Sequence, residues 1–501
     1  MRPLLAGLDM ARRFGVGNAT RDPPEFPSKL CAISDSFLPS ARAAVYRFCH
    51  PPQFPEASRL MAMSSKEMID LCKQHTLYTW AVQNQVDPWP IARAEGLYFW
   101  TPEGKRYIDF NSTLMSVLVG HSHPKVIAAM KDALDGLIFA YPQTATEARA
   151  RLGQTLAHLT PGDIDTFFFT TGGAEANENA IKIARTTTGR FKILSRYRSY
   201  HGASNATMQL TGDPRRWANE PGAPGFIRIM DPVPLQFSFG TTDEEITKNH
   251  LIYLEELIEY ENPKDIAAIF VESVTGTNGV LIPPKGWMEG LRKLTEKYGI
   301  LLVCDEVMAG FGRTGKMFAF EHGNIIPDIV TMAKGLTSSY VPLGAVGVRQ
   351  HVADALRSKY FAGGLTYNSH NFALETALAV LRVTVEEKLV ENAATMESVV
   401  RAEMDALKAK HPSFKEGRLI GLFGMMDIQK NSKGELIAPY NGAHPAMGKL
   451  AAFFRENGLF TFMRWSSFSA IPPLTVTAPQ IREAFEIIDR GLEITDAAFE
   501  G

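Results

Sequence analysis

Short apolar runs alternate with longer amphipathic segments through the middle of the chain, from about residue 144 onward. The apolar runs predict strands over residues 166–170, 192–195, 267–272, 299–304, 328–332 and 344–348. The segments between them predict helices over residues 174–185, 248–259, 287–297 and 351–359. Because the strands are apolar almost throughout, both of their faces should be covered. The pattern therefore predicts an α/β fold, with a mostly parallel sheet and helices on both faces.

The two ends of the catalytic chain lack this alternation. Residues 91–99 and 105–110 predict a hairpin that turns at Pro102, Glu103 and Gly104. After about residue 378 the pattern predicts one long helix to about residue 411, followed by mixed strands and helices. We therefore predict a large domain over residues 141–378 and a smaller α+β domain, assembled from residues 65–140 and 379–501.

Residues 1–64 are predicted to be an N-terminal extension. They are dense in proline, and their apolar residues do not recur at the spacing of a helix or a strand for long. A transit peptide would be rich in arginine and poor in acids, and the acids at positions 9, 22, 25, 35 and 56 argue against one. We expect a poorly ordered extension, with targeting to an organelle as the alternative.

Composition and charge narrow the class of protein. Across 501 residues, 52 Lys and Arg balance 54 Asp and Glu, which argues against a nucleic-acid partner. The 4 cysteines form no C-x-x-C pair, so neither a disulfide scaffold nor a zinc site is expected. No apolar run approaches the ~18 residues of a membrane span. These features favour a globular cytoplasmic enzyme.

Candidate chemistry follows two of the predicted strands. Gly172 and Gly173 join the first strand to a helix, where free backbone N–H groups and the helix dipole favour an anion. An ordinary tight turn with a helix cap is the alternative. Asp305 follows a wholly apolar strand, and a buried carboxylate there needs a cationic partner. A helix cap or a salt bridge would explain it equally well.

A third feature, a lysine at the edge of the sheet, suggests a ligand that would contact all three features. Lys334 closes the apolar run of residues 328–333, and an amine in a dry site can form a Schiff base. A lone lysine is more commonly solvated. An anion site, a buried acid and a lysine at a sheet edge are together what pyridoxal 5′-phosphate requires for its phosphate, ring nitrogen and aldehyde.

The sequence around these residues resembles a known family. The run LVCDEVMAGFGRTG at residues 302–315, followed by PDIVTMAKGL at residues 327–336, resembles the signature of class III aminotransferases. These are the ω-aminotransferases among the fold type I pyridoxal-phosphate enzymes. The resemblance covers about residues 65–492 and implies transfer of an amino group from an amino donor to a 2-oxo acid.

Carried over residue by residue, the resemblance implies three catalytic side chains. Lys334 matches the Schiff-base lysine, Asp305 matches the acid that pairs with the pyridinium nitrogen, and Tyr200 matches the aromatic residue on the ring. Among the other implied cofactor contacts, Gly172, Gly173 and Ala174 match the phosphate turn, and His201 lies beside Tyr200. Glu272 matches an acid near the rim of the cofactor, and Val307 matches the residue packed under the ring. Thr366 matches a threonine that reaches the phosphate of the neighbouring subunit. The last contact implies a homodimer with shared active sites, or a tetramer of such dimers.

The resemblance also implies a substrate site. Arg464 resembles a mobile arginine whose planar fork binds a substrate carboxylate, although a surface ion pair is the alternative. Met115 stands where related enzymes have a large aromatic residue in the pocket. We therefore expect a short ω-amino acid as donor, namely taurine, β-alanine or 4-aminobutyrate, with taurine first. The expected acceptor is 2-oxoglutarate or pyruvate.

Other functions remain open at the level of sequence. Within the same family, aminomutases, decarboxylating transaminases and lyases share the cofactor residues, and a non-catalytic relative could bind a phosphate ligand. The motifs of nucleotide-binding loops are absent from the sequence. His121 and His123 invite a metal interpretation, but they lie in a bent loop without a third ligand, so we expect no metal.

Overall fold

A seven-stranded sheet forms the centre of the computed structural model, which describes residues 63–501. The strand order is β4-β10-β9-β8-β7-β5-β6, and only β10 runs antiparallel to its neighbours. The strands are β4 (Ile164–Thr170), β5 (Lys192–Arg196), β6 (Phe226–Ile229), β7 (Ile266–Glu272), β8 (Leu301–Asp305), β9 (Ile329–Met332) and β10 (Gly344–Arg349). The mostly parallel sheet predicted from the sequence is confirmed.

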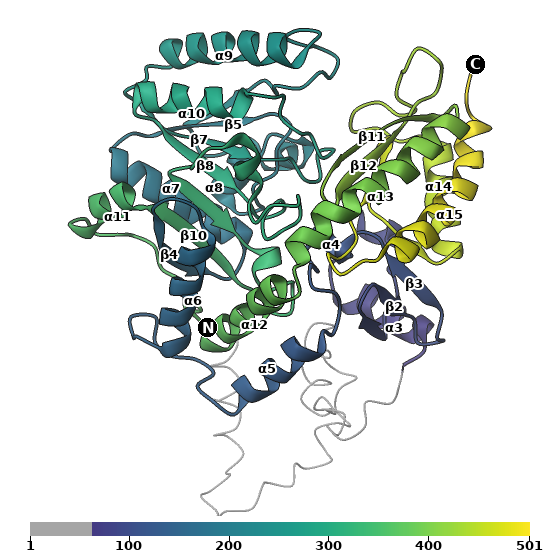
Figure 1. Cartoon of the computed structure of the whole chain (residues 1–501), viewed down its shortest axis with the longest axis horizontal. Coiled ribbons are helices and arrows are strands. Elements are labelled where there is room, and N and C mark those ends of the chain that lie inside the picture. The colour runs from purple at the N-terminus through teal and green to yellow at the C-terminus, as the bar shows by residue number, and fades with distance from the viewer. Residues whose placement is uncertain (1–62) are drawn as a thin grey trace, which may run out of the picture. The chain divides into compact units, whose positions relative to one another are not determined.

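Helices cover both faces of this sheet (Figure 1). The helices that pack on the sheet are α6 (Glu147–Leu159), α7 (Gly173–Thr188), α8 (Asn205–Leu210), α10 (Trp287–Tyr298) and α11 (Gln350–Arg357). Farther out, α9 (Asp243–Tyr260) packs on α10, and α5 (Pro124–Leu134) packs on α12 (Asn371–Glu386). Strand β7 shows why the apolar runs do not alternate. Ile269 and Val271 pack with Trp287 of α10, whereas Ala268 and Phe270 pack with Ala180 of α7. Each face of the strand therefore has its own core.

Segments from both ends of the chain share a small sheet. Strands β1 (Arg93–Glu95), β2 (Tyr98–Trp100) and β3 (Arg106–Asp109) form an antiparallel meander, and β13 (Leu459–Phe460) joins β3 in parallel. The turn at Pro102–Gly104 lies where the sequence predicted it. The single strand predicted over residues 91–99 is wrong, because Gly96 adopts a φ of 55° and divides it into two strands.

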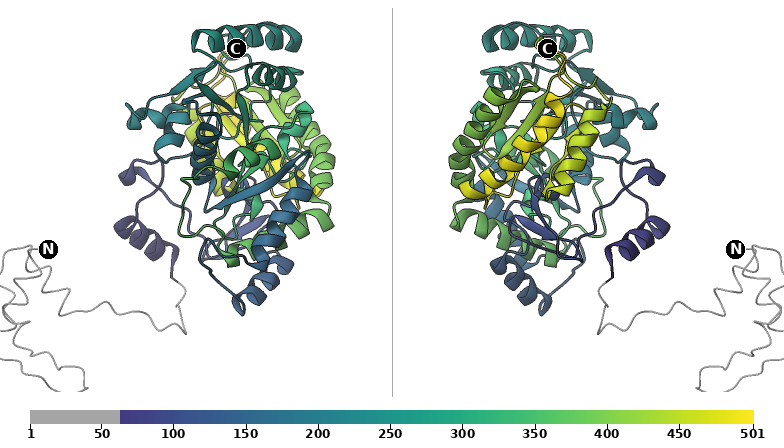
Figure 2. Two further views of the ribbon diagram at one scale, coloured as in Figure 1. Left: turned by 90° about the vertical axis from the view of Figure 1, so that its left-hand side faces the viewer. Right: turned by 90° about the vertical axis from the view of Figure 1, so that its right-hand side faces the viewer.

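The C-terminal part contains a third sheet, in the order β11-β12-β15-β14. Its strands are β11 (Phe414–Ile420), β12 (Phe423–Ile428), β14 (Met463–Arg464) and β15 (Ser467–Ala470). Helices α13 (Leu389–Lys410), α14 (Pro445–Glu456) and α15 (Ala478–Asp496) lie side by side on this part (Figure 2). No helix within residues 63–501 is long and apolar enough to cross a membrane.

The predicted long helix between residues 378 and 411 is in fact two helices. Helix α12 (Asn371–Glu386) ends before Lys388, whose φ of 53° is left-handed, and α13 then begins at Leu389. Glu387, at the break, binds Lys125 at 2.8 Å and so ties the break to α5. Residue 378 falls inside α12, and the domain division stays a prediction. The expected extension lies almost wholly outside the described residues.

Candidate active site

A cavity of about 400 Å³ opens where the strands of the central sheet end. Strands β4, β5, β7, β8 and β9 run in the same direction, so their carboxyl ends meet at one edge of the sheet. The loops that follow them line the cavity, as is usual for ligand sites in such sheets. Nine sequence-predicted residues meet there: Gly172, Gly173, Ala174, Tyr200, His201, Glu272, Asp305, Val307 and Lys334.

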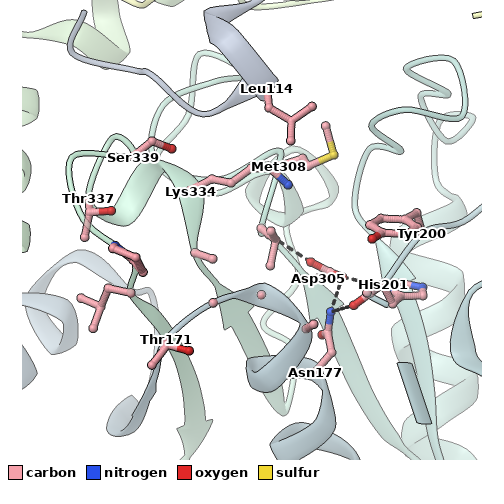
Figure 3. A pocket seen from close by; sticks show the side chains of 18 of the residues that line it. Leu114, Thr171, Asn177, Tyr200, His201, Asp305, Met308, Lys334, Thr337 and Ser339 are labelled. Carbon is pink, nitrogen blue, oxygen red and sulfur yellow. Dashed lines mark hydrogen bonds and ion pairs between the residues drawn. The ribbon is translucent and has the colours of Figure 1, made fainter. Parts of the chain in front are cut away.

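Asp305 sits at the base of the cavity with its carboxylate held from three sides (Figure 3). The amide Nδ2 of Asn177 donates to Oδ2 at 2.8 Å, and Nδ1 of His201 lies 2.8 Å from the same oxygen. The backbone N–H of Val307 donates to Oδ1 at 3.0 Å. This side chain is buried, so a carboxyl group of fixed orientation lies at the cavity floor.

Asn177 is a site residue that the sequence reasoning missed. Its Nδ2 also donates to the carbonyl of His201 at 2.8 Å, and its Oδ1 accepts from the Thr331 hydroxyl at 2.8 Å. These bonds fix which end of the amide faces Asp305. An asparagine in the second turn of a helix carries no motif of its own; only its place one turn after Gly173 could have drawn attention to it.

Lys334 projects into the cavity from the loop after β9 (Figure 3). Its backbone has a φ of 42°, an uncommon conformation for a non-glycine residue that is found at functional sites. Burial lowers the pKa of the Lys334 amine, and the negative charges of Asp305 and Glu272 oppose that shift. A lowered pKa favours the free amine, which is the form that attacks a carbonyl.

The start of α7 can receive an anion. Gly172 precedes the helix and offers no side-chain cap, so the first N–H groups are left for a ligand at the cavity wall. A Cβ at Gly173 would stand 2.9 Å from a methyl of Val307, which only glycine avoids. Together with Lys334 and Asp305, this turn matches the phosphate, aldehyde and ring nitrogen of pyridoxal 5′-phosphate.

Glu272 positions the backbone around Tyr200. Its Oε1 accepts from the Tyr200 N–H at 3.0 Å, and its Oε2 accepts from the Gly276 N–H at 2.8 Å. Burial raises the pKa of this carboxyl, with a further increase from the nearby charge of Asp305. The residue therefore lines the cavity and also ties the loop after β5 to the loop after β7.

An arginine cluster lies beside Tyr200, and the sequence reasoning found only one of its members. The guanidinium of Arg215 lies 3.7 Å from the centroid of the Tyr200 ring. Asp213, which is fully buried, binds Arg215 at 2.5 Å and Arg464 at 3.1 Å. Burial lowers the pKa of Arg464 to about 10, so the group stays positive at neutral pH. Trp80, near the N-terminus of the described chain, completes the cluster with its ring 6.1 Å from that of Tyr200.

Three predicted site residues lie outside the cavity of this chain. Arg464 is connected to it only through Asp213, Arg215 and the Tyr200 ring. Thr366 is exposed on the loop before α12. Met115 is fully buried and packs with Met308 and Val274, because its backbone turns it inward with a φ of 55°. Its neighbour Leu114 lines the cavity instead, so the expectation of Met115 as a pocket wall is corrected to Leu114.

The histidines considered as metal ligands have other partners. Nε2 of His121 lies 2.8 Å from Asp109, and Nε2 of His123 lies 3.3 Å from Glu387. Within the described part of the chain, no three His, Cys, Asp or Glu side chains gather in a way that could hold a metal ion.

Known proteins resemble this chain over most of its length. The 5-aminovalerate aminotransferase DavT of Pseudomonas aeruginosa is 33% identical, with 81% of this chain and 93% of that protein covered. The 4-aminobutyrate aminotransferase GabT of Escherichia coli is also 33% identical, with 81% and 94% covered. The structure of taurine:2-oxoglutarate aminotransferase from Bifidobacterium kashiwanohense, in complex with PLP and glutamate, is 39% identical, with a TM-score of 0.84 and 87% and 99% covered.

The family assignment rests on the whole catalytic chain rather than on one motif. The model of the family described as aminotransferase class-III matches residues 79–492. That span contains every strand of the three sheets, Asp305, Lys334 and the arginine cluster. The chain therefore belongs to the class-III aminotransferases.

Proposed function

We propose that this enzyme moves an amino group from a short ω-amino acid, of the taurine, β-alanine or 4-aminobutyrate type, to 2-oxoglutarate or pyruvate. As a class-III aminotransferase it uses pyridoxal 5′-phosphate, which supplies a carbonyl carbon for the amine and a ring that accepts electrons. The observation that carries the proposal on substrate is the pair of arginines, Arg215 and Arg464, joined by Asp213 beside the cofactor cavity.

In this proposal the residues of the cavity bind the phosphate, the ring nitrogen and the reacting group of the cofactor. The N-terminus of α7, at Gly172, Gly173 and Ala174, binds the phosphate. Asp305 holds a proton on the ring nitrogen, because a fixed carboxylate stabilises the charged form of that nitrogen. Lys334 would hold the cofactor through its amine, and that amine, when free, would be the base that moves a proton at the donor carbon.

Four further residues hold or flank the ring. Tyr200 stacks on the cofactor, and His201 orients Asp305. Val307 packs under the ring, and Glu272 fixes the loop that carries Tyr200. Each task is supported by the place of the residue in the cavity wall and by the hydrogen bonds between them.

The acid group of the donor is proposed to bind the arginine cluster. A short ω-amino acid carries its amine and its acid group at opposite ends, so an anion site beside the cofactor cavity would select it. Arg215 and Arg464 share one carboxylate, and an incoming carboxylate or sulfonate can take the place of Asp213 on either guanidinium. Taurine remains the first choice, supported by 39% identity to a taurine:2-oxoglutarate aminotransferase.

A panel of donors against 2-oxoglutarate and pyruvate tests the proposal. Acidic donors should be used far better than propylamine, which has a similar length and no acid group. Arg464→Lys keeps the charge but loses the planar fork, so KM for acidic donors should rise about 10- to 100-fold. Arg482→Lys, on exposed α15 surface, serves as the control. Equal use of propylamine and β-alanine would refute the acid-binding role.

We also propose a homodimer with shared active sites. The support is an exposed apolar patch around the Thr366 loop, which includes Phe139 and Tyr367 with their rings 6.2 Å apart. In this arrangement Thr366 binds the phosphate of the neighbouring subunit. Mixing inactive Lys334→Ala subunits with impaired Thr366→Ala subunits should restore activity, because one of the two hybrid sites is then complete. No recovery on mixing would contradict shared sites.

The cytoplasmic location is likewise a proposal. Its support within the described residues is that Cys72 and Cys304 are both free thiols, as is usual in a reducing compartment. Cell fractionation of the full-length chain tests it, and enrichment in an organelle would instead favour targeting by residues 1–64.

A further inference from the structure

The turn that follows β3 holds an unusual concentration of backbone strain. Within α4 (Ser112–Met115), three residues other than glycine have left-handed φ values: 46° at Ser112, 58° at Thr113 and 55° at Met115. Thr113 also has a ψ of −80°, which is close to the rare, strained form of the γ-turn. Residues with a Cβ rarely adopt such conformations, so the surrounding structure must hold the turn in place.

This turn carries a wall of the active-site cavity. Leu114 lies between two of the strained residues and lines the cavity on the side facing Lys334 (Figure 3). A relaxed turn would move Leu114, while the residues that hold the cofactor belong to other loops. The place of Leu114 therefore depends on whatever fastens the turn.

Asp109, the last residue of β3, fastens the turn from one side. Its fully buried carboxylate accepts the N–H of Thr113 at 2.8 Å to both oxygens, and the Thr113 hydroxyl at 3.1 Å. The N–H of Asn111 donates to it at 3.3 Å, and the His121 ring lies 2.8 Å away. Hydrogen bonds to a buried charge are stronger than neutral ones and can balance the strain.

Arg313 fastens the turn from the opposite side. It is fully buried, and it donates to the Ser112 hydroxyl at 3.0 Å. Its other nitrogen donates to the carbonyls of Leu422 and Pro472 at 2.9 and 2.6 Å. Burial lowers the pKa of Arg313 to about 9, and the charge of Asp109 opposes that shift. The two buried charges therefore stabilise each other across the turn.

We propose that Asp109 and Arg313 are positioning residues for donor selection, which together lock the turn so that Leu114 sets the length of donor that fits between Lys334 and the arginine cluster. The inference rests on the proposed function for the identity of the donors. The inference also assigns a role to Arg313, which belongs to the run at residues 302–315 and takes no part in the cofactor chemistry.

A double-mutant cycle on the holoenzyme tests the inference. The quantity measured is the ratio of kcat/KM for β-alanine to that for 5-aminovalerate, two donors that differ by two methylenes. Leu114→Ala should shift this ratio about tenfold toward the longer donor. Asp109→Asn should shift it in the same direction, mainly through KM, with an unchanged cofactor absorbance spectrum. Because both changes act on one wall, the double variant should shift the ratio no further than the larger single effect.

Other outcomes overturn the inference. Additive shifts in the double variant, or a uniform loss with every donor, would mean that Asp109 supports stability alone. Asp405→Asn, an exposed carboxylate on α13, is the matched control and should leave the ratio unchanged. If Asp109→Asn does not fold, Thr113→Val removes only one hydroxyl bond and should give a smaller shift of the same sign; no shift would count against the inference.

Failure of the proposed function gives a different result. In that case the wild-type enzyme would use no ω-amino acid at all. The ratio of kcat/KM would then be measured for propylamine against pentylamine in the same variants. A shift of this ratio in Asp109→Asn would still support the role of Asp109 in positioning Leu114, and an unchanged ratio would refute that role.

Discussion

The Asp305 carboxylate is fixed before any ligand arrives, because Asn177, His201 and the Val307 backbone all contact it. Asp305→Asn removes the charge while keeping the shape. Leaving a buried cation without its partner costs about 3–5 kcal/mol, so kcat/KM should fall roughly 10²- to 10⁴-fold. Asn177→Ala removes one donor to the same carboxylate and should cost less, about 10- to 100-fold. Steady-state kinetics check both. A near-normal rate in Asp305→Asn would contradict its role.

Glu306, the neighbour of Asp305, makes stability depend on pH. Burial raises its pKa to about 7 from 4.5. The folded protein then binds this proton more tightly than the unfolded chain, so stability falls as pH rises from about 4.5 to about 7. The variant Glu306→Gln has no group at this position that titrates in this pH range. Relative to wild type, its free energy of unfolding should therefore rise by about 3 kcal/mol over that range. Urea unfolding at several pH values measures this difference, and a constant difference would contradict the shifted pKa.

Single residues were predictable from sequence where they followed apolar runs. Asp305 and Lys334 end strands and stand out against their surroundings, so the sequence indicated both. Asn177, Asp213 and Arg215 were missed because they lie among other polar residues on a helix and a loop. The hydroxyl of Ser273 donates to Glu306 at 2.5 Å, and the sequence reasoning did not predict this contact. Such pairings depend on which loops meet in space, and the local pattern does not encode that.

The break between α12 and α13 offers a test at the level of secondary structure. Lys388 is exposed and adopts a φ of 53°, a conformation that costs residues with a Cβ about 1–2 kcal/mol. Glycine is favoured at this position after a helix. Lys388→Gly should therefore raise the free energy of unfolding by about 0.5–1 kcal/mol after its extra entropy in the unfolded chain. Lys388→Ala, which keeps the Cβ, is the matched control, and equal stability of the two variants would rule out relief of strain.

The helices and strands could be predicted from the sequence where a run of apolar residues marked a buried face. Six of the seven strands of the central sheet were predicted within a few residues, because most of their residues are apolar and buried. Strand β6 was missed, because it lies at the edge of the sheet and is only partly buried. Other errors came at residues with left-handed φ values. Gly96 divides the first predicted strand, Gly299 ends α10 before β8 begins, and Lys388 breaks the long helix. Lysine carries no turn signal, so that break follows from tertiary contacts such as the one between Glu387 and Lys125.

The whole molecule joins parts that are far apart in sequence. Strand β13, near the C-terminus, pairs with β3, and Arg464 reaches Asp213 across 251 positions. Arg313 binds the turn before it and two segments after it in the chain. The sequence predicted a small domain from both ends because neither end shares the alternation of the middle of the chain. It did not predict which strands pair, because neither end carries a pattern that identifies its partner.

A single-turnover spectrum of the purified enzyme tests directly whether it takes the amino group of an ω-amino acid. The enzyme is mixed with taurine, β-alanine or 4-aminobutyrate in the absence of any oxo acid, and the absorbance of its cofactor is followed. We expect at least one of these donors to change the spectrum once and then stop. Adding 2-oxoglutarate or pyruvate should restore the spectrum and yield one equivalent of glutamate or alanine. No spectral change with any ω-amino acid, or continued turnover without an oxo acid, would contradict an ω-amino acid transaminase.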